Sequence, residues 1–255
     1  MSFSPILALL LSLVAIVGGN SLEGGHFSSL VQPTAFLIVF GGTIGAAWLG
    51  ATDKELKTLW RLLPRVVWTN ATDRQKLLDQ MVSIAQIVRR DGMLAVENKL
   101  SDVDNLFLRK GLGLLVDGNS AEDVAKVLEL EVELETHHDS SAGKVLEAAG
   151  GFAPTIGILG AVLGLIHVMN NLSDPTKLGS GIAVAFVATV YGVGVANILL
   201  IPLGNRMKKQ VAEDAEVKNM ILTGLEVIAS GANPRQVEET LSPYIGHHGK
   251  AKEVA

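Results

Sequence analysis

The chain has 255 residues, of which 48% are hydrophobic and only 18% are charged, and its mean hydropathy is +0.37. Soluble domains carry about 25% charged residues, so this composition indicates a membrane protein with several spans. The net charge of −5 excludes a basic footprint for nucleic acid. The absence of cysteine excludes disulfides, thiolate metal sites and cysteine chemistry.

Four stretches contain no Asp, Glu, Lys or Arg: residues 1–22, 27–52, 148–172 and 178–205. A helix needs about 20 apolar residues to cross the hydrocarbon core, so each is a candidate span. The apolar part of the first has the length of a signal peptide. No basic residue precedes it, and we therefore expect an uncleaved span. The sequence predicts an all-α, multi-pass fold with transmembrane helices 1 and 2 in residues 1–52 and helices 3 and 4 in residues 148–205.

Lys and Arg are distributed very unevenly between the connecting segments. Twenty of the 21 lie in residues 53–147 or 206–255, and the remaining one is Lys177. The positive-inside rule therefore predicts that both segments, and both termini, are cytoplasmic. Helical periodicity and a cap signal at Ser120 predict that residues 53–147 form a helical cytoplasmic domain, whose last helix leads into the third span. Residues 206–255 are predicted to be a helical cytoplasmic tail.

Small residues recur at helical spacing along the last two spans. Gly157, Gly160 and Gly164 follow one another in the third span, and Ala185 and Gly192 belong to the corresponding stripe in the fourth. Such stripes allow helix backbones to approach closely in lipid. We expect this hairpin to pack closely against other helices and to present a few hydroxyl groups to them.

The residues carry no signature of catalysis. A nucleophile elbow, a phosphate loop and metal-ligand spacing are all absent, so we expect neither an enzyme nor a cofactor. Apart from His167, near the outer end of the third span, the spans hold no group that could take up and release protons. If the hairpin lines an ion path, the titrating carboxylate must come from a partner helix.

Two simple interpretations apply to the polar and cyclic residues of the hairpin. Thr155 and Thr189 could each bond a carbonyl of their own helix, as threonine commonly does in membranes. Pro154 could begin a helix and Pro202 could end one.

Several segments resemble the A subunit of flagellar motor stators, the MotA/PomA family. Residues 152–166 resemble its third span, and residues 174–175, 182–192 and Asn197 resemble its fourth. Residues 114–118 and 233–235 match further family segments, so the resemblance covers essentially the whole chain and the four-span layout.

The resemblance implies a homopentameric ring in the bacterial inner membrane around a dimer of single-span, MotB-type B subunits. The B helix would supply the ion-carrying aspartate, and the complex would convert ion-motive force into torque for flagellar motility. Pro154 and Pro202 match prolines that the family uses to couple ion passage to movement, while Thr155 lies on the same ion path.

The resemblance also assigns Arg89, Arg90 and Glu97 to the surface that engages the rotor protein FliG. In one continuous helix Arg90 and Glu97 would share a face, although Asp91-Gly92 could break it. The alternative for all three charges is an ordinary solvated face.

The transported ion is predicted from three positions on the ion path. Sodium-type members place hydroxyls where this chain has Ala161 and Ala188, and they keep a threonine at the position of Thr189. Dehydrated sodium needs several oxygen ligands and a proton does not, so the resemblance favours protons.

Two alternatives remain open from the sequence. An energiser of the ExbB/TolQ type shares the proton-channel hairpin but has fewer spans and acts on outer-membrane partners. A passive membrane scaffold would use the small-residue stripes for assembly alone.

Overall fold

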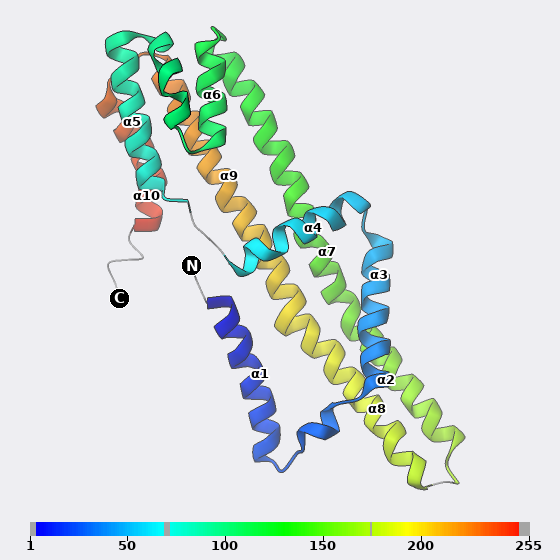
Figure 1. Ribbon diagram of the computed structural model, residues 1–255. Helices are drawn as coiled ribbons and strands as arrows, with labels where there is room; N and C mark the ends of the chain where they lie inside the picture. The colour runs from blue at the N-terminus through cyan, green and yellow to red at the C-terminus, as the bar shows by residue number, and fades with distance from the viewer. Residues whose placement is uncertain (1–3, 69–71, 174, 250–255) are drawn as a thin grey trace. The chain divides into compact units, whose positions relative to one another are not determined.

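The computed structural model describes residues 4–68, 72–173 and 175–249, and every regular element in this part of the chain is helical (Figure 1). The predicted all-α class is confirmed. Asp174, in the predicted turn between the third and fourth spans, lies outside the described residues.

The chain divides into two compact units. The first, here called the span unit, comprises Met1–Asn70 and His138–Gln210; the second, the polar unit, comprises Ala71–His137 and Val211–Ala255. Two long helices contribute to both units. They are α7 (Ala121–Asn170) and α9 (Ile201–Ala229).

The span unit is built from helices that are consecutive in sequence, and several of them meet end to end. Its first part consists of α1 (Ser4–Leu22), η1 (Phe27–Leu30), α2 (Pro33–Phe36), η2 (Leu37–Gly41), α3 (Gly42–Gly50) and α4 (Asp53–Val67). Its second part consists of the end of α7, then α8 (Pro175–Gly194), η4 (Val195–Leu200) and the start of α9. Both η2 and η4 are π-helical turns inside longer helical runs.

Four helical runs are long and apolar enough to cross a membrane. Within the described residues they begin at Pro5, Phe27, Ala121 and Leu178, and each overlaps one of the four uncharged stretches of the sequence. The predicted continuity of the third span is also confirmed, because α7 runs unbroken from Ala121 to Asn170. Ser120 caps that helix, and its hydroxyl oxygen accepts a hydrogen bond of 3.1 Å from the backbone nitrogen of Asp123.

Helix α4 belongs to the span unit, although the sequence-based division placed it with residues 53–147. It begins with a capping box in which Thr52 and Glu55 satisfy each other's backbone N–H groups. The helix is amphipathic and buries Thr58, Leu62 and Val66 on one face. This buried face packs within the span unit and therefore groups the helix with the spans.

The polar unit joins two segments that the sequence-based division kept apart. Its shorter helices are α5 (Arg74–Asp91), η3 (Met93–Asp102), α6 (Leu106–Val116) and α10 (Pro234–Gly249), which pack with the polar-unit parts of α7 and α9. Large apolar side chains fill the core between them, among them Met81, Leu108, Leu112, Leu128, Met220, Ile221 and Leu241. Because the last two elements of the chain supply part of this core, the tail is not a separate segment.

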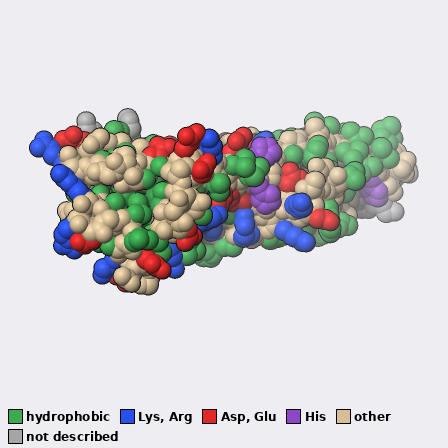
Figure 2. All heavy atoms as spheres, turned by 90° about the horizontal axis from the view of Figure 1, so that it is seen from above, with side chains coloured by type: hydrophobic (Ala, Val, Ile, Leu, Met, Phe, Trp, Pro, Cys, Tyr) green, Lys and Arg blue, Asp and Glu red, His purple; other side chains and the backbone are tan. Residues whose placement is uncertain are grey.

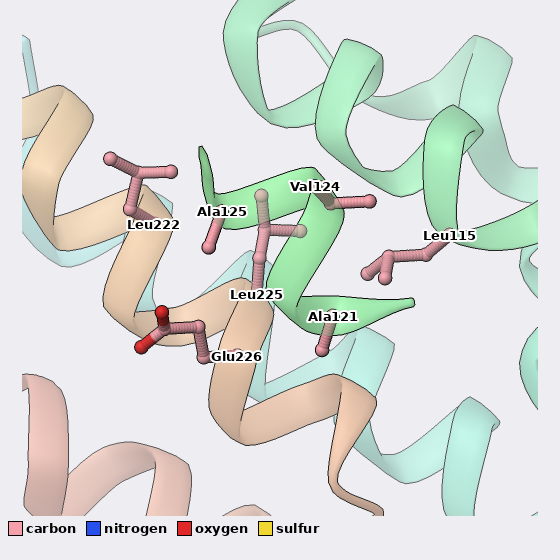
Figure 3. A pocket seen from close by; sticks show the side chains of 7 residues that line it. All are labelled: Leu115, Ala121, Val124, Ala125, Leu222, Leu225 and Glu226. Carbon is pink, nitrogen blue, oxygen red and sulfur yellow. The ribbon is translucent and has the colours of Figure 1, made fainter. Parts of the chain in front are cut away.

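The polar unit also contains a shallow apolar hollow between the end of α6, the start of α7 and α9 (Figure 3). Six aliphatic side chains and the exposed Glu226 line it. The hollow is too small to admit a water molecule, so it is a packing feature and not a ligand site. Figure 2 shows acidic and basic side chains interspersed on the face that it draws, without a large area of one sign.

Candidate functional site

The small-residue stripes of α7 and α8 face each other inside the chain. A methyl group built on Gly192 would lie 2.5 Å from the carbonyl oxygen of Ala153 and 3.0 Å from the Cα of Gly157. A methyl group on Gly164 would lie 2.8 Å from the backbone nitrogen of Ala185. Backbone therefore meets backbone along this contact, which we call the α7–α8 seam and define by Gly157, Gly164, Gly181 and Gly192. Only residues without a side chain fit at these positions.

Ala188 lies on the buried side of α8. Its exposed fraction is 0%, and it packs with Ala35 and Val39 of the second span. A methyl group on Gly160 would lie 2.8 Å from the Cβ of Ala188, so α7 closes over it from the other side. Ala161, the second residue of the predicted ion discrimination, is half-buried. The two alanines thus occupy different surroundings in this chain, and their role in ion choice stays a prediction.

The two threonine hydroxyls bond carbonyls of their own helices. Thr155 is exposed, and its Oγ1 donates a hydrogen bond of 2.7 Å to the carbonyl of Phe152. Thr189 is half-buried, and its Oγ1 lies 3.3 Å from the carbonyl oxygen of Ala185. The second bond is long for a hydroxyl donor, for which about 2.7–2.8 Å is usual, so the Thr189 hydroxyl is the easier of the two to redirect toward a partner.

Pro154 and Pro202 both lie within helical segments, so neither begins nor ends a span. Pro154 is inside α7, and Pro202 is the second residue of α9, directly after the π-helical turn η4. Proline has no N–H, so the carbonyls of Gly150 and Ile198 lose their usual i+4 donors. Backbone without a full set of hydrogen bonds bends more easily than an ordinary helix. Pro154 is half-buried and Pro202 is exposed.

Tyr191 connects α8 to the beginning of the second span, a link that the sequence had not assigned. Its hydroxyl donates a hydrogen bond of 2.5 Å to the carbonyl of Leu30 and accepts one of 3.4 Å from the backbone nitrogen of Gln32. The ring also stands edge-on to Phe40, with 6.2 Å between centroids. A tyrosine in an apolar span needs a hydrogen-bond partner for its hydroxyl, and that requirement is the signal that could have indicated this contact.

The three predicted rotor-facing charges lie at the end of α5 and just beyond it. Arg89 and Arg90 are in the last turn of α5, Glu97 is in η3, and all three are exposed. Gly92 separates them and has a φ of 83°, a conformation that ends the helix. The break that the sequence indicated at Asp91-Gly92 is therefore present, and Arg90 and Glu97 do not share a face of one continuous helix.

Arg90 forms a local ion pair. Its guanidinium binds the carboxylate of Asp91 at 2.7 Å through Nη2 and at 2.9 Å through Nε. The hydrogen bond from Arg90 lowers the pKa of Asp91, and the same bond raises the pKa of Arg90. In contact with another charged surface, Arg90 would either leave Asp91 for a new partner or bind both.

The spans offer no ion-binding group of their own. They contain no Asp, Glu, Lys or Arg, and the described residues include no group of three or more His, Asp or Glu arranged to hold a metal ion. The arrangement is a closely packed hairpin of membrane-spanning helices that presents small surfaces and a few hydroxyl groups.

Comparison with known proteins narrows this class. Residues 99–220 match the model of the MotA/TolQ/ExbB proton channel family, and residues 6–92 match the model of the motility protein A N-terminal region. The chain is 34% identical to motility protein A of Bacillus subtilis (strain 168) over 253 residues, which covers 96% of this chain and 91% of that protein.

Solved structures of the same family resemble this chain over nearly its full length. The chain resembles the C. jejuni MotAB structure with a TM-score of 0.92 and 31% identity, covering 97% of each chain. It resembles the flagellar MotAB stator complex from Bacillus subtilis with a TM-score of 0.88 and 31% identity, covering 99% of this chain and 100% of that one. The chain belongs to the MotA branch of the MotA/TolQ/ExbB proton channel family.

Proposed function

We propose that this chain is the ion-channel A subunit of a flagellar motor stator, and that with a B subunit it converts proton-motive force into torque on the rotor. The observation that carries the proposal is the combination of a closely packed α7–α8 hairpin with spans that contain no Asp, Glu, Lys or Arg. Such a hairpin can line an ion path, but it has no carboxylate to carry the ion. The full-length similarity to MotAB stator complexes supports a B subunit as the source of the missing carboxylate.

The proposed assembly is a homopentameric ring around a dimer of single-span, MotB-type subunits in the bacterial inner membrane. Both termini and the polar unit lie in the cytoplasm, because 20 of the 21 Lys and Arg residues fall in the two segments assigned to that side. The exposed Arg89, Arg90 and Glu97 are the proposed contact with the rotor protein FliG.

Within the ring, Thr189 and Pro154 lie near the carboxylate of the B subunit. A carboxylate in a poorly hydrated path is costly to ionise unless it is protonated or hydrogen-bonded. Thr189 can supply a hydrogen bond by turning its hydroxyl away from the Ala185 carbonyl, to which it is bound at 3.3 Å. Pro154 and Pro202 allow α7 and α9 to bend when the carboxylate changes charge.

Rotation measured against independently varied proton and sodium gradients tests the proposal. The speed should follow the proton gradient, and speed that follows sodium at a fixed proton gradient would overturn the ion assignment. Thr189→Val, which keeps the shape and loses the hydroxyl, should impair rotation severalfold, whereas Thr189→Ser should retain most of it. Unchanged rotation with Thr189→Val would remove the proposed role of the hydroxyl.

An ExbB/TolQ-type energiser remains the second candidate because it shares the channel hairpin. Residues 6–92 match the motility protein A N-terminal model, and this observation favours the motor. Deletion of the gene should abolish flagellar rotation and leave outer-membrane uptake processes intact; the reverse result would favour the energiser.

A further inference from the structure

A cluster of polar side chains joins α4 to α7 within the span unit. Of the three buried polar side chains among the described residues, two, Thr58 and Asp139, belong to it. One carboxylate oxygen of Asp139, Oδ1, accepts a hydrogen bond of 2.6 Å from Arg61 and lies 3.1 Å from Nδ1 of His138. The other ring nitrogen of His138, Nε2, lies 3.4 Å from the hydroxyl of Thr58.

Among the ionisable side chains of this cluster, the carboxylate of Asp139 is the least exposed to solvent. Its side chain is 10% exposed, against 61% for its partner Arg61. A buried carboxylate is tolerated only when it is paired and hydrogen-bonded, so the position of Arg61, and of α4 with it, is tied to Asp139. A solvated surface ion pair would impose no such constraint.

The opposite end of α4 is held by α9. Arg206 donates from Nε to the carbonyl of Val66 at 3.0 Å, and Gln210 donates to the carbonyl of Arg65 at 3.2 Å. The last carbonyls of a helix have no intrahelical partners, so these two bonds cap α4 from the side. Helix α4 therefore lies across α7 and α9, as Figure 1 shows. These are the two helices that carry Pro154 and Pro202.

We propose that Asp139 is a positioning residue that holds α4 as a brace between α7 and α9, and that protonation of His138 tightens this brace. The inference rests on the proposed function in one respect. From it we take that the brace lies on the side of the membrane to which protons are delivered. Acidification of that side then stiffens the two helices that must bend during each cycle.

The hydrogen-bonding capacity of histidine gives the direction of the effect. Neutral His138 donates from Nδ1 to Asp139 and accepts at Nε2 from the Thr58 hydroxyl. Protonated His138 donates from both nitrogens, so the Thr58 oxygen becomes the acceptor and the bond to Asp139 becomes charge-assisted. Both contacts of His138 persist on protonation. The hydrogen bond with Thr58 reverses its direction, and the bond to Asp139 becomes stronger.

Other charged groups lie in the region of His138. They include Glu55 and Arg61 on α4 and Lys144 on α7. On α9, Lys208 pairs with Glu147 farther along α7. The closest charged partner of His138 is Asp139, whose Oδ1 lies 3.1 Å from Nδ1.

The absence of cysteine makes a site-specific probe simple to introduce. A nitroxide attached at Lys57→Cys, an exposed position of α4, reports the mobility of this helix in the purified complex with the B subunit. The label should become less mobile as the pH is lowered from 8 to 5.5. His138→Gln should abolish this pH response, while His137→Gln, a change at the neighbouring exposed histidine, should retain it.

Two further variants separate positioning from folding. Asp139→Asn should leave α4 mobile at every pH. Arg61→Gln leaves His138 as the charged partner of Asp139, so the pH response should become larger. A label mobility that is independent of pH in the unmodified chain, or a full response in His138→Gln, would overturn the proposal. The spectroscopic result does not depend on which ion drives rotation, so a failure of the proton assignment appears only in the rotation assay.

Discussion

The α7–α8 seam and the core of the polar unit stabilise the same chain by opposite means. Large side chains fill the polar-unit core, where Met81, Leu108 and Leu112 are fully buried. The seam instead brings backbone to backbone at Gly157 and Gly192. In water, removing apolar area from solvent favours large residues. In lipid that gain is absent, and close backbone contact supplies the attraction.

The largest effect is expected from a cavity in the polar unit. Leu112→Ala removes a fully buried side chain and should lower the free energy of unfolding by about 2–5 kcal/mol. Leu94→Ala, at a position that is 71% exposed, should change it by less than about 0.5 kcal/mol. Thermal unfolding of the purified complex checks both variants. Equal effects would mean that Leu112 is not a core residue.

The next effect is expected from the opposite change in the seam. Gly192→Ala adds one methyl group where it would lie 2.5 Å from a backbone oxygen, and overpacking of this kind costs about 1–3 kcal/mol. Gly194→Ala, two residues along the same helix, adds a methyl group with nothing within 4 Å and is the matched control. Unfolding in detergent should separate the two variants. If they are equally stable, the two helices do not meet in the way that the geometry indicates.

A smaller effect on stability is expected at the N-terminal cap of α4. This cap belongs neither to the polar-unit core nor to the α7–α8 seam. Thr52→Ala removes the capping box and should cost about 0.5–2 kcal/mol. Hydrogen bonds from the backbone and the side chain of Thr52 lower the pKa of Glu55. Because that pKa is depressed in the folded state, the contribution is fully present above the unfolded value and is lost as the pH falls through the folded value. Stability measured from pH 6 to pH 3 should fall less steeply in Glu55→Gln than in the unmodified chain.

The smallest effect on stability is expected at the charges beyond the core. Arg89→Gln, Arg90→Gln and Glu97→Gln together should leave the unfolding temperature within a few degrees, because all three residues are exposed. If they contact the rotor, torque should fall severalfold while proton leak stays unchanged. Lys99→Gln with Lys126→Gln, at exposed positions outside the proposed contact, serves as the control. Normal torque in the triple variant would show that these charges form a solvated surface.

Local chemistry in the sequence determined much of the fold. The uncharged runs located the spans, because a charged residue in hydrocarbon is costly wherever the rest of the protein lies. Ser120 marked the start of α7, since a helix cap depends on a few neighbouring residues. The small-residue stripes likewise predicted that these spans make close contacts with other helices.

Only the tertiary structure decided which surfaces those stripes contact and which polar groups meet. The seam closes within the chain, and Ala188 is therefore buried against α7 and the second span. The cluster around Asp139 joins residues about 80 positions apart, and Tyr191 reaches Leu30 across 161 positions. Helical periodicity specifies the face on which a residue lies and not the partner of that face. For the same reason the sequence assigned α4 by its charge, while its buried face groups it with the spans.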